Sequence, residues 1–175
     1  MNINFDKCME MLLKHEGGYV NGNKIGDPGG ITNMGVTKRT YDEYHGVDMD
    51  EEGMKSLTVE DVTPIYKDYY WYRCSCERLP SGVDWAVFDA SVNHGTGRAA
   101  KFLQKAVGSN MDGSIGPLTL CNVGFVEPAE IINRIAVYRD AFYRSLGTFD
   151  TFGKGWIRRN DETRETALEL ITEPK

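Results

Sequence analysis

Two acidic residues and a hydroxyl lie close together in the first part of the sequence, in a stretch rich in glycine. Glu16 is followed by two glycines, Asp27 comes eleven residues later, and Thr32 and Asn33 follow. An acid that releases a proton, opposed by a carboxylate and a hydroxyl that orient water, supplies the groups that hydrolysis of a glycosidic bond requires. Loops of this composition line polar clefts, but they also serve as plain connections. The pattern makes Glu16 a candidate general acid.

A helix expected over residues 4–15 would position this glutamate. At about 100° per residue, Met9, Leu12 and Glu16 share one stripe with Phe5, so Glu16 continues the apolar face of the helix. Desolvation at the wall of an apolar core favours the proton-carrying form of a carboxylic acid, as a general acid needs. The alternative is a glutamate at a frayed helix end that points to water, although the helix dipole disfavours an anion there.

A second acid lies on an apolar helix face in "DWAVFDASVNHG". Asp89 falls within the stripe formed by Trp85 and Phe88, and Asn93 lies beside it one turn later. One interpretation makes Asp89 and Asn93 part of a cleft floor that binds substrate. The other has Asp89 satisfy buried backbone groups or an arginine.

Helical signals dominate the rest of the chain. Thr58, with Asp61 three residues later, predicts a capping box at the start of a helix. The only sheet that the pattern favours is a small hairpin within residues 17–36. Further helices are expected over residues 37–45, 58–72, 81–94 and 97–108, from residue 117, and over about 127–146 and 156–171. The sequence therefore predicts a mainly α fold with a small hairpin or loop after the first helix.

Length and charge narrow the class of protein. The 175 residues suit one compact domain or two fused lobes. A net charge of −6 argues against nucleic-acid binding, which needs a basic footprint. No run reaches the roughly 18 apolar residues of a spanning helix, and the first residues do not follow the signal-peptide pattern, so we expect a cytoplasmic protein without a membrane anchor.

Two patterns of charged residues in the sequence predict no binding site. "DMDEEG", residues 48–53, matches the start of a calcium loop, but Val59 stands where the bidentate glutamate belongs, so no metal is expected. Arg134, Arg139 and Arg144 are five residues apart and do not share a helix face. This spacing predicts scattered side chains that are exposed to solvent.

Taken together, the motifs resemble the glycoside hydrolase family 108 N-acetylmuramidases, found among phage endolysins and related bacterial proteins. The resemblance rests on "EGGYVN", "DPGGITNMGVT", "YYWYRC", "LPSGVDWAVFDASVNHG", "FLQKAVG", "DGSIGPLT" and "FGKGWIRR". It implies a lysozyme-like helical fold and cleavage of the β-1,4 bond between N-acetylmuramic acid and N-acetylglucosamine, without a cofactor. It also implies that Glu16 is the catalytic glutamate, and the arrangement of phage lysozymes would assign Asp27 and Thr32 as its partners.

The resemblance further implies one lysozyme-like globule over residues 1–175. We expect a lobe of residues 1–76 with the catalytic motif and a helical lobe of residues 77–175 that resembles a predicted peptidoglycan-binding region. The protein is then expected to be a monomer that binds glycan strands and depends on a holin for release from the cytoplasm. The residues expected to bind substrate are Tyr19, Asn33, Tyr70, Trp71, Asp89 and Asn93.

Two rival functions stay open at this stage. A lytic transglycosylase needs one glutamate and no water, and it leaves an anhydro-sugar end. A non-catalytic wall-binding or secretion-accessory protein would keep the fold and perform no chemistry.

Overall fold

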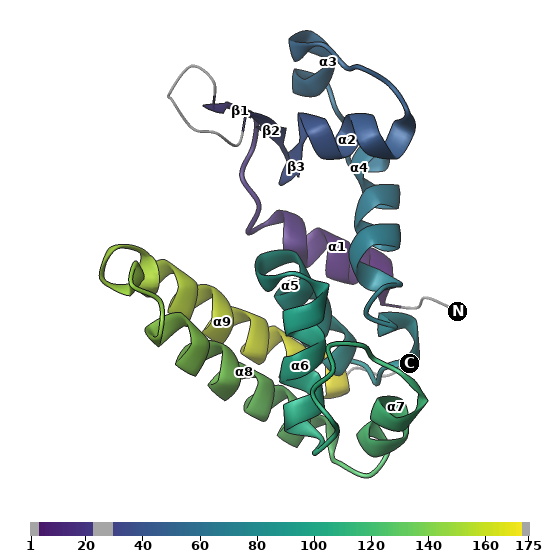
Figure 1. Cartoon of the computed structure of the whole chain (residues 1–175), viewed down its shortest axis with the longest axis vertical. Helices are drawn as coiled ribbons and strands as arrows, with labels where there is room; N and C mark the ends of the chain where they lie inside the picture. The colour runs from purple at the N-terminus through teal and green to yellow at the C-terminus, as the bar shows by residue number, and fades with distance from the viewer. Residues whose placement is uncertain (1–3, 23–29, 173–175) are drawn as a thin grey trace. The chain divides into compact units, whose positions relative to one another are not determined.

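The computed structural model describes residues 4–22 and 30–172. By its internal contacts the chain divides into two compact units. The smaller unit is Asp6–Tyr69, and the larger unit runs from Tyr70 toward the C-terminus and includes Phe5. Helices make up most of both units (Figure 1), which confirms the predicted mainly α fold.

The smaller unit combines four helices in its described part with a small sheet. Its elements are α1 (Phe5–Leu13, whose first residue belongs to the larger unit), β1 (Val20–Asn21), β2 (Ile31–Asn33), β3 (Val36–Thr37), α2 (Lys38–His45), α3 (Glu51–Lys55) and α4 (Val59–Tyr66). The strands pair antiparallel in the order β1-β2-β3, with Val20 opposite Thr32 and Asn33 opposite Val36. The sheet follows α1, where the sequence predicts a hairpin.

The turn between β2 and β3 consists of two residues with left-handed backbone. Met34 has φ 46° and Gly35 has φ 76°. Positive φ at both central residues is the geometry that matches the twist of a tight hairpin. Gly35 adopts it without strain, since it has no Cβ. The turn therefore sets the path of the chain directly before α2.

Helix α4 begins as the sequence predicts and ends differently. The backbone N–H of Thr58 donates to the carboxylate of Asp61 at 2.8 Å, which is one half of the expected capping interaction. Pro64 lies inside the helix, and the α-helical pattern ends at Tyr66. The next five residues, Lys67–Trp71, form a π-helix.

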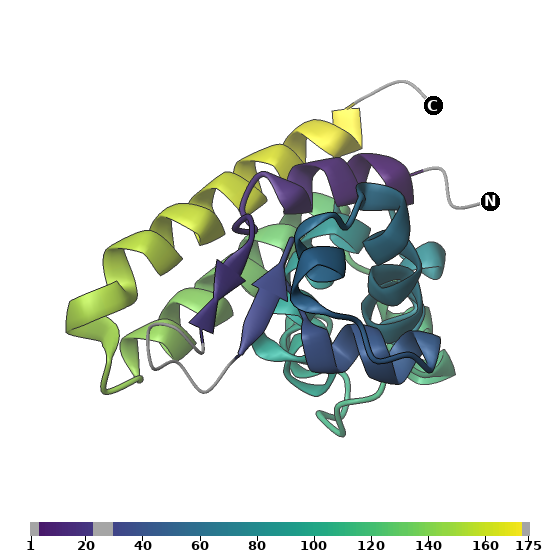
Figure 2. The same ribbon diagram turned by 90° about the horizontal axis from the view of Figure 1, so that it is seen from above.

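The regular elements in the described part of the larger unit are all helical. Its elements are a 3₁₀ turn (Cys76–Arg78), α5 (Val83–His94), α6 (Thr96–Ala106), α7 (Pro117–Val123), α8 (Pro128–Arg144) and α9 (Phe149–Thr172). Residues Val83 to Ser91 of α5 are all buried, as expected of a helix that is apolar on every side. Helices α6, α8 and α9 pack around it, and α8 and α9 run side by side (Figures 1 and 2).

Residues from the start of the chain complete the core of the larger unit. The ring of Phe5 lies 5.2 Å from that of Trp71 and 5.9 Å from that of Phe88. The side-chain amide of Asn4 donates to Ser81 at 2.9 Å and to Asp84 at 2.8 Å. These contacts join segments that are far apart in the sequence.

Several element boundaries differ from the prediction. The first helix ends at Leu13, two residues early, and α9 begins at Phe149, seven residues early. Helix α3 was not predicted, because its five residues are too few for a helical periodicity. None of the described helices combines the length and the apolar composition needed to cross a bilayer.

Candidate active site

Glu16 lies in the turn that follows α1. The last helical residue is Leu13, but the backbone N–H of Glu16 still donates to the carbonyl of Leu12 at 3.2 Å. This bond continues the i→i−4 pattern for one step beyond the helix. The side chain is partly buried, which places it between the two alternatives of a buried and a solvated glutamate.

The carboxyl group of Glu16 lies against the hairpin turn and a buried tyrosine. A Cβ atom built on Gly35 would lie 2.7 Å from Oε2 of Glu16 and 2.4 Å from the hydroxyl of Tyr66. Real Cβ atoms essentially never make contacts below 3.0 Å. The two side chains therefore meet at a space that only glycine leaves open.

Tyr66 is fixed at this place by its own hydrogen bond. Its hydroxyl donates to the backbone carbonyl of Met34 at 2.8 Å, and its side chain is only 1% exposed. The turn residue Met34, the glycine and the tyrosine thus form one wall beside Glu16. A carboxyl group confined by such a wall has fewer orientations to sample than one at a free helix end, which is the kind of preorganisation that catalysis requires.

The predicted partners of Glu16 have different positions. Asp27 lies outside the described residues. Thr32 is the central residue of β2, partly exposed, with Val20 and Thr37 opposite it in the neighbouring strands. The sheet therefore fixes the backbone of Thr32 beside the turn that contacts Glu16.

Tyr19 and Asn33 both hold the short helix α3. The hydroxyl of Tyr19 donates to the carboxylate of Glu51 at 2.9 Å, and the amide of Asn33 donates to the carbonyl of Met54 at 2.8 Å. Asn33 is 6% exposed, so its amide serves this internal contact. These bonds attach α3 to the strands.

The other residues expected to bind substrate belong to the larger unit. Trp71 is 1% exposed and packs against Phe5 and Phe88, whereas Tyr70 is partly exposed. Asn93 is exposed, and its side-chain amide donates to the carbonyl of Asp89 on its own helix at 2.9 Å.

Asp89 lies at the centre of a buried ion-pair cluster. Its carboxylate accepts from Arg139 at 2.8 Å, from Arg159 at 2.8 Å and from the hydroxyl of Thr163 at 3.2 Å. Burial alone would raise the pKa of Asp89, but the two guanidinium groups outweigh it and hold that pKa below its ordinary value. The alternative in which Asp89 pairs with an arginine is the one observed.

The prediction that Arg139 is solvated is wrong. Its side chain is 1% exposed, because the charge that would otherwise require water is paired with Asp89. The cluster connects α5 with α8 and α9.

Gly35 and Tyr66 are contacts of Glu16 that the sequence did not reveal. Gly35 stands inside "DPGGITNMGVT", so its motif was visible although its contact was not. Tyr66 gives no local signal, because it lies far along the chain from Glu16.

The fold and the site thus define a class of protein, in which a lysozyme-like helical fold has a partly buried glutamate after its first helix. A sequence model of the family described as "Glycosyl hydrolase 108" matches residues 9–95, a range that includes Glu16, Gly35 and Tyr66. A solved structure titled "Structure of Brucella abortus SagA" is 40% identical, covers 99% of this chain and 98% of that chain, and has a TM-score of 0.86. The chain therefore belongs to the glycosyl hydrolase 108 family. A search of curated proteins gives no match.

Proposed function

We propose that the protein hydrolyses the β-1,4 bond between N-acetylmuramic acid and N-acetylglucosamine in peptidoglycan, with Glu16 as the general acid. The observation that carries the proposal is the confinement of the Glu16 carboxyl group by Gly35 and Tyr66. Membership of a glycoside hydrolase family supports the reaction class.

In the proposed mechanism, Glu16 gives its proton to the glycosidic oxygen as the bond to the anomeric carbon breaks. Positive charge develops on the sugar ring in an oxocarbenium-like transition state. Water then adds to the anomeric carbon and loses a proton, so the products are a free hydroxyl on one sugar and a reducing end on the other. Asp27 and Thr32 are proposed to orient this water, while Tyr66 and Gly35 position Glu16.

The test is a digest of purified sacculi by the wild-type protein, with the soluble products identified by mass spectrometry. Reducing muramic-acid ends are expected. Anhydro-muramic ends would instead identify a lytic transglycosylase, in which no water is needed. Sacculi that retain the folded protein but release no fragment would identify a non-catalytic wall-binding or secretion-accessory protein.

The cellular setting that we propose is that of an endolysin. A monomeric muramidase of this kind would reach the wall from the cytoplasm only after a holin or a similar partner permeabilises the membrane. This setting rests on the resemblance to phage endolysins and is separate from the chemistry at Glu16.

Replacing Gly35 by alanine is expected to lower kcat by about 10- to 100-fold and to leave KM nearly unchanged. The new methyl group would displace the Glu16 carboxyl group or the Tyr66 hydroxyl, and a misplacement of about 1 Å at a catalytic group can cost about 100-fold. The measurement is steady-state cleavage of soluble glycan oligomers.

Gly46→Ala is the matched control for this substitution. Gly46 also has a left-handed backbone, with φ 68°, but a Cβ there would meet nothing within 4 Å. Both variants carry about 1–2 kcal/mol of backbone strain, so both lose stability, but only the first is expected to lose kcat. Equal rates for the two variants would contradict the role given to Gly35.

A further inference from the structure

A pocket of about 360 Å³ is lined only by residues of the larger unit. It is built by the end of α5, the first turn of α6, the last turn of α8 with the residues after it, and the first third of α9. Its lining includes Asn93, His94, Arg98, Phe142, Tyr143 and Trp156. A volume of this size is at the lower end of the range of small-molecule sites, about 300–1,000 Å³.

One wall of the pocket is aromatic. The rings of Tyr143 and Trp156 are stacked, with centroids 5.3 Å apart and planes inclined by 20°. Phe152, which is 54% exposed, extends this surface with its ring centroid 5.8 Å from that of Trp156. Of the stacked pair, Trp156 is partly exposed, whereas Tyr143 is 4% exposed and supports Trp156 from inside. An exposed edge of an indole ring combines an apolar surface with a polar N–H, a combination that suits contact with a sugar ring.

Arg98 adds a positively charged group to this aromatic lining. Its side chain is exposed, and its guanidinium carbon lies 4.1 Å above the centre of the Phe142 ring. This cation–π contact holds the guanidinium group at the ring, and a guanidinium group has five N–H donors with which to bind a carboxylate. No acidic residue is among the described residues that line the pocket, so a cationic pocket lies on a chain whose net charge is −6.

His94 adds a second polar group to the lining. Its Nε2 atom is buried and makes no hydrogen bond to any of the described residues. Burial and then the charge of Arg139 lower the pKa of His94 to about 3, so the imidazole is neutral near pH 7. A neutral imidazole offers one donor and one acceptor and adds no charge, which leaves Arg98 as the charged group of the described lining.

We infer that this pocket binds a carboxylate carried by a muramic-acid residue, with the carboxylate on Arg98 and the sugar against Trp156. The ligand class rests on the proposed function, because peptidoglycan is the source of that sugar. The carboxylate is the lactyl group of muramic acid where the stem peptide is absent, and the terminal carboxylate of the attached amino acid where a single amino acid remains. The site would thus distinguish muramic acid from glucosamine.

The experiment uses the full chain with Glu16→Gln, so that binding is read without cleavage. The ligands are N-acetylglucosamine, N-acetylmuramic acid and N-acetylmuramyl-L-alanine, titrated while the three tryptophan indole N–H signals are followed by NMR. Trp71 and Trp85 are buried, so the signal of Trp156, assigned with Trp156→Phe, reports the pocket. Both carboxylates are expected to bind at least about tenfold more tightly than N-acetylglucosamine, as one charge-assisted hydrogen bond provides.

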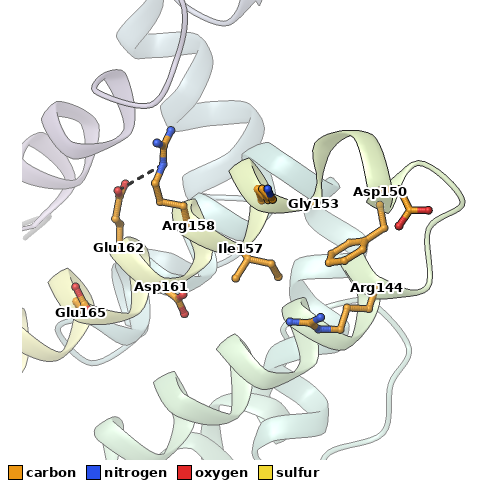
Figure 3. A pocket seen from close by; sticks show the side chains of 10 residues that line it. Arg144, Asp150, Gly153, Ile157, Arg158, Asp161, Glu162 and Glu165 are labelled. Carbon is orange, nitrogen blue, oxygen red and sulfur yellow. Dashed lines mark ion pairs between the residues drawn. The ribbon is translucent and has the colours of Figure 1, made fainter.

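Arg98→Gln, made in the same Glu16→Gln background, is expected to abolish this preference, and Arg158→Gln is its matched control. Arg158 lies in a neighbouring groove of about 620 Å³, where carboxylates accompany the cations (Figure 3). It is 79% exposed and lies 3.9 Å from Glu162, so its removal changes the net charge equally but not the pocket. The control is expected to keep the preference.

Three results would overturn the inference. They are equal affinity for the three sugars, a preference that survives Arg98→Gln, and binding without a shift of the Trp156 signal. Binding by only one of the two carboxylates would support the inference and identify which source the site accepts. Absence of binding by both carboxylates would also overturn the inference but would leave the result of the sacculus digest unchanged. Failure of the digest, in turn, would not alter this titration.

Discussion

Glu16→Gln is expected to abolish nearly all cleavage of purified sacculi, a loss of about 100- to 10,000-fold, which is the usual contribution of a general acid. Glutamine has the shape of glutamate but carries no acidic proton, so it cannot protonate the leaving oxygen. Because the shape is kept, the contacts with Gly35 and Tyr66 and the fold are expected to survive. The measurement is the yield of soluble muropeptides per unit time.

Glu10→Gln is the matched control for the charge change. Glu10 is exposed and lies on α1, six residues before Glu16. This variant is expected to digest sacculi at the wild-type rate, and thermal unfolding should show that both variants are folded. Full activity of Glu16→Gln would mean that another group supplies the proton, and it would remove the central residue of the proposed mechanism.

Asp89→Ala is expected to lower the free energy of unfolding of the larger unit by about 3–5 kcal/mol. The substitution leaves the guanidinium groups of Arg139 and Arg159 without their shared partner, and Arg139 is buried at 1% exposure. Urea unfolding followed by tryptophan fluorescence measures this unit specifically. All three tryptophans, at positions 71, 85 and 156, belong to it.

Asp140→Ala provides the comparison on the surface. Asp140 also pairs with an arginine, Arg144, at 2.7 Å, but both side chains are partly exposed to solvent. Exposed pairs contribute about 0–1 kcal/mol, so this variant is expected to remain near the wild-type stability. Similar losses for the two variants would show that burial does not determine the effect.

The sign of the pH dependence follows from the lowered pKa of Asp89. A folded pKa below the unfolded value means that the contribution is fully present above the unfolded value and is lost as pH falls through the folded one. The stability difference between the wild type and Asp89→Ala should therefore persist at neutral pH and shrink in acid, below about pH 3.9. A difference that grows in acid would contradict this account.

Local signals in the sequence predicted most of the fold. The capping residues Thr58 and Asp61 marked the start of α4 because that interaction involves residues only a few positions apart. Glu16 could be chosen as the candidate acid because its motif is local too. The sequence could not show that Tyr66 meets Glu16, or that Arg139 is buried beside Asp89, because both contacts depend on how distant segments pack.

For Asp89, periodicity predicted the direction of the side chain but could not identify its partners. Its position on an apolar stripe predicted that the carboxylate faces inward, and it does. Whether an inward carboxylate binds a ligand or an arginine depends on partners that come from other helices. Periodicity contains no information about them.

The contacts of Asn4 and Phe5 with the larger unit also determine the order in which the chain can fold. During synthesis the first residues leave the ribosome long before Ser81, Asp84 and Phe88, so the Phe5 ring has no core to enter at that time. The smaller unit draws only on residues 6–69 and can form earlier. The larger unit closes only after α9 has been made, since Ser81 also donates to the carbonyl of Leu170 at 2.9 Å. Completion of this core is thus a late, high-contact-order event that we expect to limit the folding rate.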